Sequence, residues 1–237
     1  MPIQGGFANY GQAVGIIMLD TVFPRISGDV GNATTFAFPV RYKVVKGASA
    51  QRVVKDCDPT LLGPFLDAAR ELEGEGVKAL ATSCGFLAMY QRQLAGAVNI
   101  PVFSSSLLQV HLAKSVISDR RQVGIITARA QSLTEQHLAG VDAHHIPVVI
   151  AGMEDAPEFT AVFLEGKATI DVAKVELEMV LAARRLVETY PSVGAIVLEC
   201  TNMPPFAKSV QDAVNLPVFD AITLVNYAYS VVVHRKF

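Results

Sequence analysis

Short apolar runs that stop at a polar or small residue recur along the chain, and two of them are near copies of each other. Residues 77–86 read VKALATSCGF and residues 193–202 read VGAIVLECTN, so each run leads to a cysteine, Cys84 or Cys200. Small and β-branched apolar residues that follow a turn are typical of strands buried on both faces of a parallel sheet. We therefore expect each cysteine to lie where a buried strand ends.

The similarity continues downstream of both cysteines. Pro101 follows Cys84 by 17 positions (101 − 84), and Pro217 follows Cys200 by 17 positions (217 − 200). The chain reads AVNIPVF in 97–103 and AVNLPVF in 213–219, and VGII occurs at 14–17 and again at 123–126. Similar segments in the same order indicate an internal duplication. Each half should therefore place its cysteine at the same point of the fold.

The spacing of apolar residues predicts strands that alternate with helices. The expected strands cover 13–19, 34–45, 77–84, 100–103, 123–127, 145–150, 193–200 and 216–219. The expected helices cover 58–74, 87–95, 107–117, 132–138, 170–190, 205–214 and 221–232. Such alternation produces right-handed parallel crossovers. The expected fold class is α/β, with two similar doubly wound parallel-sheet units related by a pseudo-two-fold axis and an active site in the cleft between them.

The boundary between the units should lie at Asp119-Arg120-Arg121, the most polar point before the pattern restarts. Residues 1–119 would then form a first α/β half carrying Cys84, and residues 120–237 a second half carrying Cys200. The helix expected at 221–232 is free to pack back on the first half.

Composition and charge narrow the class of protein. The chain has 237 residues, a hydrophobic fraction of 51% and a mean hydropathy of +0.36, which fits sheets covered on both faces. The formal net charge is −2 and no basic stripe occurs, so neither nucleic acid nor a membrane is an expected partner. No apolar run has the length of a membrane span, the first residues do not resemble a secretory signal, and three cysteines do not describe a disulfide framework. We expect a cytoplasmic protein, with a homo-oligomer such as a dimer left open.

Polar residues gather where the expected strands end. Doubly wound sheets bind their ligands beyond the carboxyl ends of the strands. The residues at these ends are Asp20, Thr21, Cys84, Ser104, Thr127, Cys200 and Asp220. If the halves face each other across a pseudo-two-fold axis, Cys84 and Cys200 lie on opposite sides of one cleft.

Two facing thiols suit chemistry that needs a base on one side of a carbon atom and an acid on the other. One thiolate removes a proton from a stereocentre and the other thiol returns a proton to the opposite face, which inverts the centre. An ordinary thiol has a pKa of about 8.5, and backbone N–H groups at the start of a helix favour its charged form. Because Gly85-Phe86 and Thr201-Asn202 follow the cysteines, we expect their amides to favour a thiolate together with a substrate carboxylate.

The motifs Thr82-Ser83-Cys84-Gly85 and Glu199-Cys200-Thr201-Asn202, with Asp20-Thr21 after the first strand, resemble those of the cofactor-independent aspartate/glutamate/hydantoin racemase superfamily. The resemblance covers nearly the whole chain. It implies an isomerase, a racemase or epimerase that inverts a centre next to a carboxylate or carbonyl, in an amino acid such as aspartate or glutamate or in a hydantoin. It also implies proton transfer by Cys84 and Cys200 without metal, pyridoxal phosphate or another cofactor.

The resemblance implies that a small carboxylate or amide substrate contacts residues around both cysteines. These residues are Asp20, Thr21, Ser83, Gly85, Phe86, Thr127, Thr201 and Asn202. Glutamate racemases typically have Cys-Asn-Thr and Cys-Thr-His at the two motifs, whereas this chain has Cys84-Gly85-Phe86 and Cys200-Thr201-Asn202. Phe86 favours an apolar part of the substrate, so the identity of the substrate stays open.

Two other functions also stay open. Hydantoin racemases, maleate isomerases and arylmalonate decarboxylases share the scaffold. One alternative is therefore a cis-trans isomerase or lyase that uses one thiolate as nucleophile on an unsaturated or dicarboxylic acid. The further alternative is a non-catalytic small-molecule binding protein, because two α/β lobes with a cleft describe such proteins as well.

The remaining chemical signals are weaker. His144 and His145 resemble a metal pair, but adjacent residues of a strand point to opposite faces, so we expect no metal site there. Residues 28–31 lack the dinucleotide-binding pattern. Cys57 has no counterpart in the other half and is expected to be a small structural residue.

Overall fold

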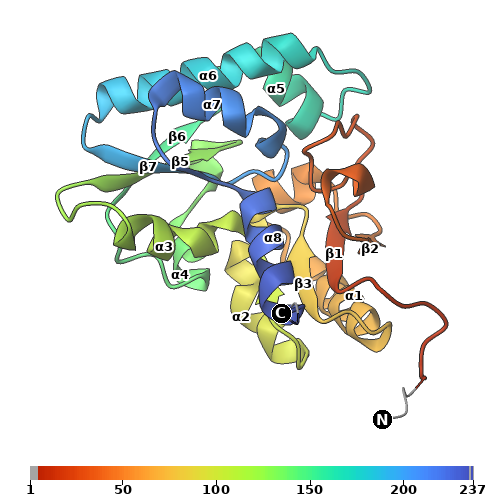
Figure 1. Cartoon of the computed structure of the whole chain (residues 1–237). Coiled ribbons are helices and arrows are strands. Elements are labelled where there is room, and N and C mark those ends of the chain that lie inside the picture. The colour runs from red at the N-terminus through yellow and green to blue at the C-terminus, as the bar shows by residue number, and fades with distance from the viewer. Residues whose placement is uncertain (1–4, 235, 237) are drawn as a thin grey trace.

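The computed structural model describes residues 5–234 and 236, and it contains two four-stranded parallel sheets (Figure 1). The first sheet has the order β2-β1-β3-β4 and the second has the order β6-β5-β7-β8. Its strands are β1 (Val14–Leu19), β2 (Val40–Val45), β3 (Ala79–Thr82), β4 (Val102–Phe103), β5 (Gln122–Thr127), β6 (Val148–Gly152), β7 (Val193–Leu198) and β8 (Val218–Phe219). The strand order is the same in both sheets, which confirms the expected α/β fold of two similar units.

Helices cover both sheets, and several of them start with a 3₁₀ turn. The α-helices are α1 (Leu62–Gly74), α2 (Gln91–Ala97), α3 (Val110–Ser115), α4 (Glu135–Gly140), α5 (Pro157–Phe159), α6 (Val172–Thr189), α7 (Ala207–Val214) and α8 (Ala221–Val232). The 3₁₀ turns are η1 (Ala33–Thr35), η3 (Pro59–Leu61), η4 (Gly85–Tyr90), η5 (Ser106–Gln109), η6 (Ala130–Ser132) and η8 (Pro204–Phe206), and the π-helical turns are η2 (Gln51–Lys55) and η7 (Thr160–Leu164).

The sequence explains the main features of this arrangement. Every residue of the central strands β1 and β7 is buried, as their unbroken apolar composition predicts, whereas the edge strands β2 and β6 are mostly half-buried. Asp58 caps the start of η3 and α1 by accepting a hydrogen bond from the Thr60 amide at 2.9 Å, with Pro59 inside the first turn. This cap marks the start of the helix expected at 58–74, which the structure forms as η3 followed by α1.

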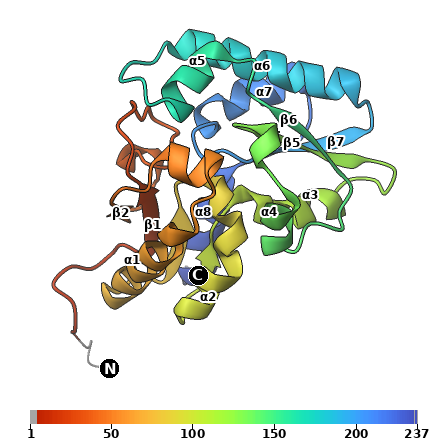
Figure 2. The ribbon, with the colours of Figure 1, turned by 180° about the vertical axis from the view of Figure 1, so that it is seen from behind.

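The two halves meet through helices as well as through their loops. Helix α8, at the end of the chain, packs on the first sheet, where Ala221 and Val225 join a buried cluster with Val14 and Ile16 of β1 (Figure 1). On the opposite side, α4 of the second half lies against η4 of the first half (Figure 2). The segment that begins at Cys84 is thus held between both halves.

Three local expectations need correction. The strand expected at 145–150 starts only at Val148, and His144 and His145 lie in a turn. No helix was expected between the strand at 145–150 and the helix at 170–190, but this stretch contains α5, and η7 follows it. The strand expected at 34–45 begins at Val40, because Pro39 cannot donate to a sheet ladder.

Two further observations concern sequence-based exclusions. The expectation about a secretory signal depends partly on residues 1–4, which lie outside the described residues. No helix in the described part of the chain combines the length and the apolar character that crossing a lipid bilayer requires.

Candidate active site

The ends of β3 and β7 bring the two cysteine motifs together. The Thr201 hydroxyl of the second motif donates to the backbone oxygen of Ser83 in the first motif at 2.6 Å, across 118 positions of the chain. Cys84 is 7% exposed and Cys200 is half-buried. A charge on Cys84 raises the pKa of Cys200, so the two thiols lie within electrostatic reach of each other. Both cysteines therefore belong to one site at the junction of the halves.

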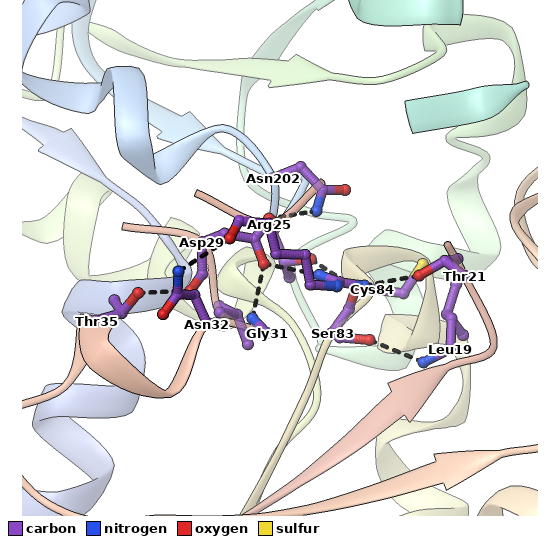
Figure 3. Close-up of polar contacts among 12 residues, drawn as sticks. Leu19, Thr21, Arg25, Asp29, Gly31, Asn32, Thr35, Ser83, Cys84 and Asn202 are labelled. Atoms are coloured by element: carbon purple, nitrogen blue, oxygen red, sulfur yellow. Dashed lines mark hydrogen bonds and ion pairs between the residues drawn. The ribbon is translucent and has the colours of Figure 1, made fainter. Parts of the chain in front are cut away.

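A row of polar side chains leads from Asn202 through Asp29 and Arg25 to Thr21, close to Cys84 (Figure 3). The Cys200 thiol donates to Asn202 Oδ1 at 3.5 Å, and Asn202 Nδ2 donates to Asp29 Oδ2 at 2.7 Å. The other oxygen of Asp29 pairs with Arg25 Nη1 at 2.7 Å, and Arg25 Nη2 donates to the Thr21 hydroxyl at 2.9 Å. We name these five residues, Cys200, Asn202, Asp29, Arg25 and Thr21, the polar chain.

The polar chain fixes the orientation of the Asn202 amide. An ionised carboxylate only accepts hydrogen bonds, so Asp29 must face the amide nitrogen of Asn202. The amide oxygen is then left for Cys200, where it accepts the thiol proton. A hydrogen bond to the neutral form of an acid favours that form. The polar chain thus favours the protonated thiol at Cys200.

Arg25, toward the other end of the polar chain, favours the charged thiolate form of Cys84. The positive charge of Arg25, and the backbone amides of Phe86 and Leu87, lower the pKa of Cys84. Burial and then the charge of Glu199 outweigh them, however, and raise the pKa of Cys84 to about 12. The amides therefore act in the expected direction, but they do not decide the charge of the resting thiol. The physical reason is that both thiols are desolvated beside a carboxylate.

Glu199, next to Cys200 in the sequence, is fully buried. Its Oε2 accepts a hydrogen bond from the Thr127 hydroxyl at 2.8 Å, while no partner for Oε1 is found among the described residues. Burial raises the pKa of Glu199 to about 7. A Cβ atom built on Gly85 would overlap Glu199 Oε1 and the Glu199 backbone oxygen. Only a glycine after Cys84 leaves room for this carboxyl group.

Ser83, Phe86 and Asp20, which were also expected at the site, form contacts with other parts of the chain. The Ser83 hydroxyl accepts a hydrogen bond from the Leu19 amide at 2.9 Å and so fixes the end of β3. Phe86 is buried and meets the His137 ring edge to face at 5.0 Å. Asp20 accepts from the Gly47 amide at 3.0 Å, which lowers the pKa of Asp20 and directs it to the loop after β2. The substrate contacts expected for these three residues stay predictions.

Sequence reasoning missed three residues of the site: Arg25, Asp29 and Glu199. Arg25 and Asp29 belong to the irregular segment after β1, where no periodicity marks a residue, and the partner Asn202 is 173 positions away from Asp29. Glu199 is part of the motif at Cys200, and a charged residue at the end of a wholly apolar strand was the available signal.

A cavity of about 270 Å³ lies next to this site, between the two halves. Thr21 and Phe23 line it from the first half, and Phe163 and Leu164 line it from the second. The rings of Phe23 and Phe163 meet edge to face at 5.2 Å. A ligand that occupies this cavity therefore meets apolar rings and the Thr21 end of the polar chain.

The described residues also contain one surface cluster of metal-ligating type, away from the cysteine motifs. Asp142, His144 and His145 are exposed, and their ligating atoms lie within 4.8 Å of one another. The sequence argument that separated the two histidines assumed a strand, whereas the residues lie in a turn. That argument was wrong, although the carboxylate of Asp142 already has Arg92 at 3.6 Å.

The polar chain should also contribute to stability. Arg25→Leu should lower the free energy of unfolding by about 3 kcal/mol, because the carboxylate of Asp29, 2% exposed, then lacks its cation. Arg25→Lys should cost less, since it keeps the charge but not the forked contact to Thr21. Urea denaturation measures both, with the exposed Arg120→Leu as a control expected to stay within about 0.5 kcal/mol. An Arg25→Leu variant as stable as the control would contradict this role.

Comparison with known proteins places the chain in a family. The model of the Asp/Glu/hydantoin racemase family matches residues 44–225. Dimethylsulfoniopropionate lyase 7 of Emiliania huxleyi is 32% identical over 224 residues, which are 90% of this chain and 65% of that protein. The chain thus spans about two thirds of the length of that relative. A dimethylsulfoniopropionate lyase of Durusdinium sp. clade D is 30% identical over 222 residues, 91% of this chain and 73% of that protein.

The solved structures agree on the fold. Glutamate racemase from Bacillus anthracis aligns with a TM-score of 0.60 at 15% sequence identity, over 94% of this chain and 85% of that one. The family match covers most of the chain, including Cys84 and Cys200, and the strand order and the paired motifs agree with it. The chain belongs to the Asp/Glu/hydantoin racemase family.

Proposed function

We propose that this protein is a lyase that removes a proton from the carbon next to a carboxylate and releases a leaving group from the following carbon. The proposed substrate class is a β-sulfonio carboxylate, with dimethylsulfoniopropionate as its representative. The observation that carries this proposal is the similarity of 90% or more of the chain to proteins named dimethylsulfoniopropionate lyases. The geometry around the cysteines supports it independently.

The proposed reaction needs one base and no acid. The Cys84 thiolate takes the proton from the α-carbon, and the electrons of that C–H bond form a double bond to the β-carbon. The bond between the β-carbon and the sulfonium sulfur breaks, and its electrons leave with the sulfur. The products are acrylate and neutral dimethyl sulfide, which needs no proton to depart. The proton stays on Cys84 until solvent removes it.

The polar chain supports Cys84 as the base. Arg25 acts on Cys84 and lowers its pKa, whereas the charge of Asp29 raises the pKa of Cys200, whose proton is directed to Asn202. The backbone amides of Phe86 and Leu87, at the start of η4, also lower the pKa of Cys84. Such N–H groups stabilise negative charge as it develops during proton removal.

The charge of the site supports a substrate that carries a positive group near the thiols, as the zwitterionic β-sulfonio carboxylates do. Two carboxyl groups, Asp29 and Glu199, lie near the thiols against one cation, Arg25. A sulfonium group adds a positive charge and therefore favours ionisation of a buried thiol. A dicarboxylate such as aspartate or glutamate adds negative charge and disfavours it. The net charge thus distinguishes β-sulfonio carboxylates, which are neutral overall, from aspartate and glutamate, whose two carboxylates outweigh their one ammonium group.

Racemisation is the second candidate, because the fold brings two cysteines to one site. It requires both thiols, since the proton must return from the face opposite to the base. A lyase requires proton removal alone. The number of essential cysteines therefore distinguishes the two functions.

The test is a substrate panel with purified protein in heavy water. Dimethylsulfoniopropionate should yield dimethyl sulfide in the headspace and acrylate in the proton spectrum. Aspartate, glutamate and a hydantoin, followed by polarimetry and by the loss of the α-proton signal, should stay unchanged. Inversion of a panel member with deuterium incorporation, and no dimethyl sulfide from the sulfonium compound, would replace the lyase by the racemase.

A further inference from the structure

We propose that Glu199 is a positioning residue that sets the charge of the cysteine pair: ionised, it holds both cysteines as thiols, and protonated, it permits one of them to become a thiolate. This inference rests on the proposed function only for its purpose, since a base must form before an α-proton can be removed. The geometry behind it needs no substrate.

The first observation is the position of the carboxyl group between the two motifs. Glu199 precedes Cys200 in the sequence, and its Oε1 faces Gly85, which follows Cys84. The backbone of β7 holds it there, because the Glu199 amide donates to the Ile126 oxygen at 2.8 Å. One ionisable group therefore adjoins both cysteine motifs.

The second observation is the lack of full compensation for a charge on this group. Glu199 is 0% exposed, and Oε1 has no hydrogen-bond partner among the described residues. Thr127, which donates to Oε2, and the backbone amide of Ala128 favour the charged form, but burial outweighs both. A buried carboxylate with an unpaired oxygen is costly, and protonation removes that cost. Burial accordingly raises the pKa of Glu199 to about 7.

The third observation is that the charge of Glu199 acts on both thiols. After burial, it is the largest cause that raises the pKa of Cys84 and also of Cys200. The other charges that act on these thiols are Arg25, which lowers the pKa of Cys84, and Cys84 and Asp29, which raise the pKa of Cys200. Burial brings the pKa of Glu199 to about 7, so the charge of Glu199 changes close to neutral pH.

The test measures ionisation of each thiol directly. In a Cys57→Ser background, alkylation of Cys84 and Cys200 by iodoacetamide is followed by mass spectrometry as a function of pH. Glu199→Gln should move the midpoint of thiolate formation to lower pH at both cysteines, because the opposing charge is gone. No substrate is present, so a protein without lyase activity would still show this shift.

A matched control is Ser106→Ala. Ser106 is equally buried, and its hydroxyl donates to the backbone oxygens of Leu198 and Glu199 at 2.7 Å and 3.1 Å. Its removal disturbs the same segment without changing a charge, and the alkylation profile should stay in place. A folded Glu199→Gln variant with the parental profile, or an equal shift in Ser106→Ala, would overturn the proposal.

A measurement on the unchanged protein covers the case in which Glu199→Gln fails to fold. With glutamate labelled by ¹³C, the infrared band of a protonated carboxyl group should be present in mildly acidic solution and vanish as the pH rises through about 7. The free energy of unfolding should also decrease as the pH rises toward about 7. Folding raises the pKa of this carboxyl group from about 4.5, its value in the unfolded chain, to about 7. The resulting stabilisation is complete below about pH 4.5 and is lost as the pH rises through about 7. Absence of the band above pH 4.5 would overturn the proposal.

Discussion

Replacing Cys84 by serine should reduce dimethyl sulfide release by a factor of about 10²–10⁴, the range that a positioned general base contributes. A serine hydroxyl fills nearly the same space but ionises far less readily than a thiol, so the α-proton has no acceptor. The variant should fold, because serine is close to cysteine in size and keeps the backbone contact of this residue, from the Cys84 amide to the Thr82 hydroxyl at 3.4 Å. Headspace gas chromatography measures the loss.

The matched comparison is Cys200→Ser. A serine at this position can still donate to Asn202 Oδ1, and the elimination needs no proton from it. Cys200→Ser should therefore retain much more activity than Cys84→Ser. Equal and complete loss in both variants would favour the two-base chemistry of a racemase, and full activity in Cys84→Ser would reject Cys84 as the base.

The second large effect is expected from Gly85→Ala, which should both destabilise and inactivate the protein. The added methyl group would overlap the carboxyl and backbone oxygens of Glu199, where two halves of the chain cross with no room for a side chain. Overpacking of this kind costs about 1–3 kcal/mol or more. It would also displace the start of η4, which directly follows Cys84, so activity should fall further than stability.

The control for this substitution is Gly96→Ala in α2. Gly96 is exposed, and a Cβ atom built on it meets nothing within 4 Å. Alanine is the better helix former by about 1 kcal/mol, so this variant should be as stable as the parent or more stable. Thermal and urea unfolding compare the two. Gly85→Ala with parental stability and activity would show that η4 and Glu199 are not packed as described.

The internal duplication made most of the fold predictable. The paired segments around Pro101 and Pro217 gave the order of elements twice, and apolar runs such as residues 193–198 marked the buried strands. The errors lie in polar connections. At His144 and His145, for example, a mixed polar and apolar pattern continued into β6, and the strand starts later because a turn with Asp142 at φ 63° precedes it.

The sequence indicated site residues where expected strands end, as at Thr21 and Thr127, and the internal repeat strengthened this at the two cysteines. Cys84 and Cys200 were identified because they share a position relative to strand and proline, and Thr201 and Asn202 because they follow the second cysteine. The roles of Thr201 and Asn202 could not be predicted from the sequence. Thr201 connects the motifs through the Ser83 oxygen, and Asn202 connects Cys200 to Asp29, contacts that join distant parts of the chain.

No local sequence pattern predicted the balance of charges at the site. Arg25 and Asp29 lie four residues apart in an irregular segment, where such a pair usually has no function. Their importance comes from burial between the halves, and the raised pKa values of Cys84 and Glu199 come from the same burial. Burial at a junction depends on the whole fold, so it could not be derived from the residues one by one.

The most direct test of the account is the rate of dimethyl sulfide release from dimethylsulfoniopropionate that carries protium or deuterium at the α-carbon. If a cysteine removes the α-proton, the deuterated compound should react more slowly, and Cys84→Ser should abolish release from both. Release at equal rates from the two compounds, undiminished in Cys84→Ser, would contradict proton removal by this cysteine.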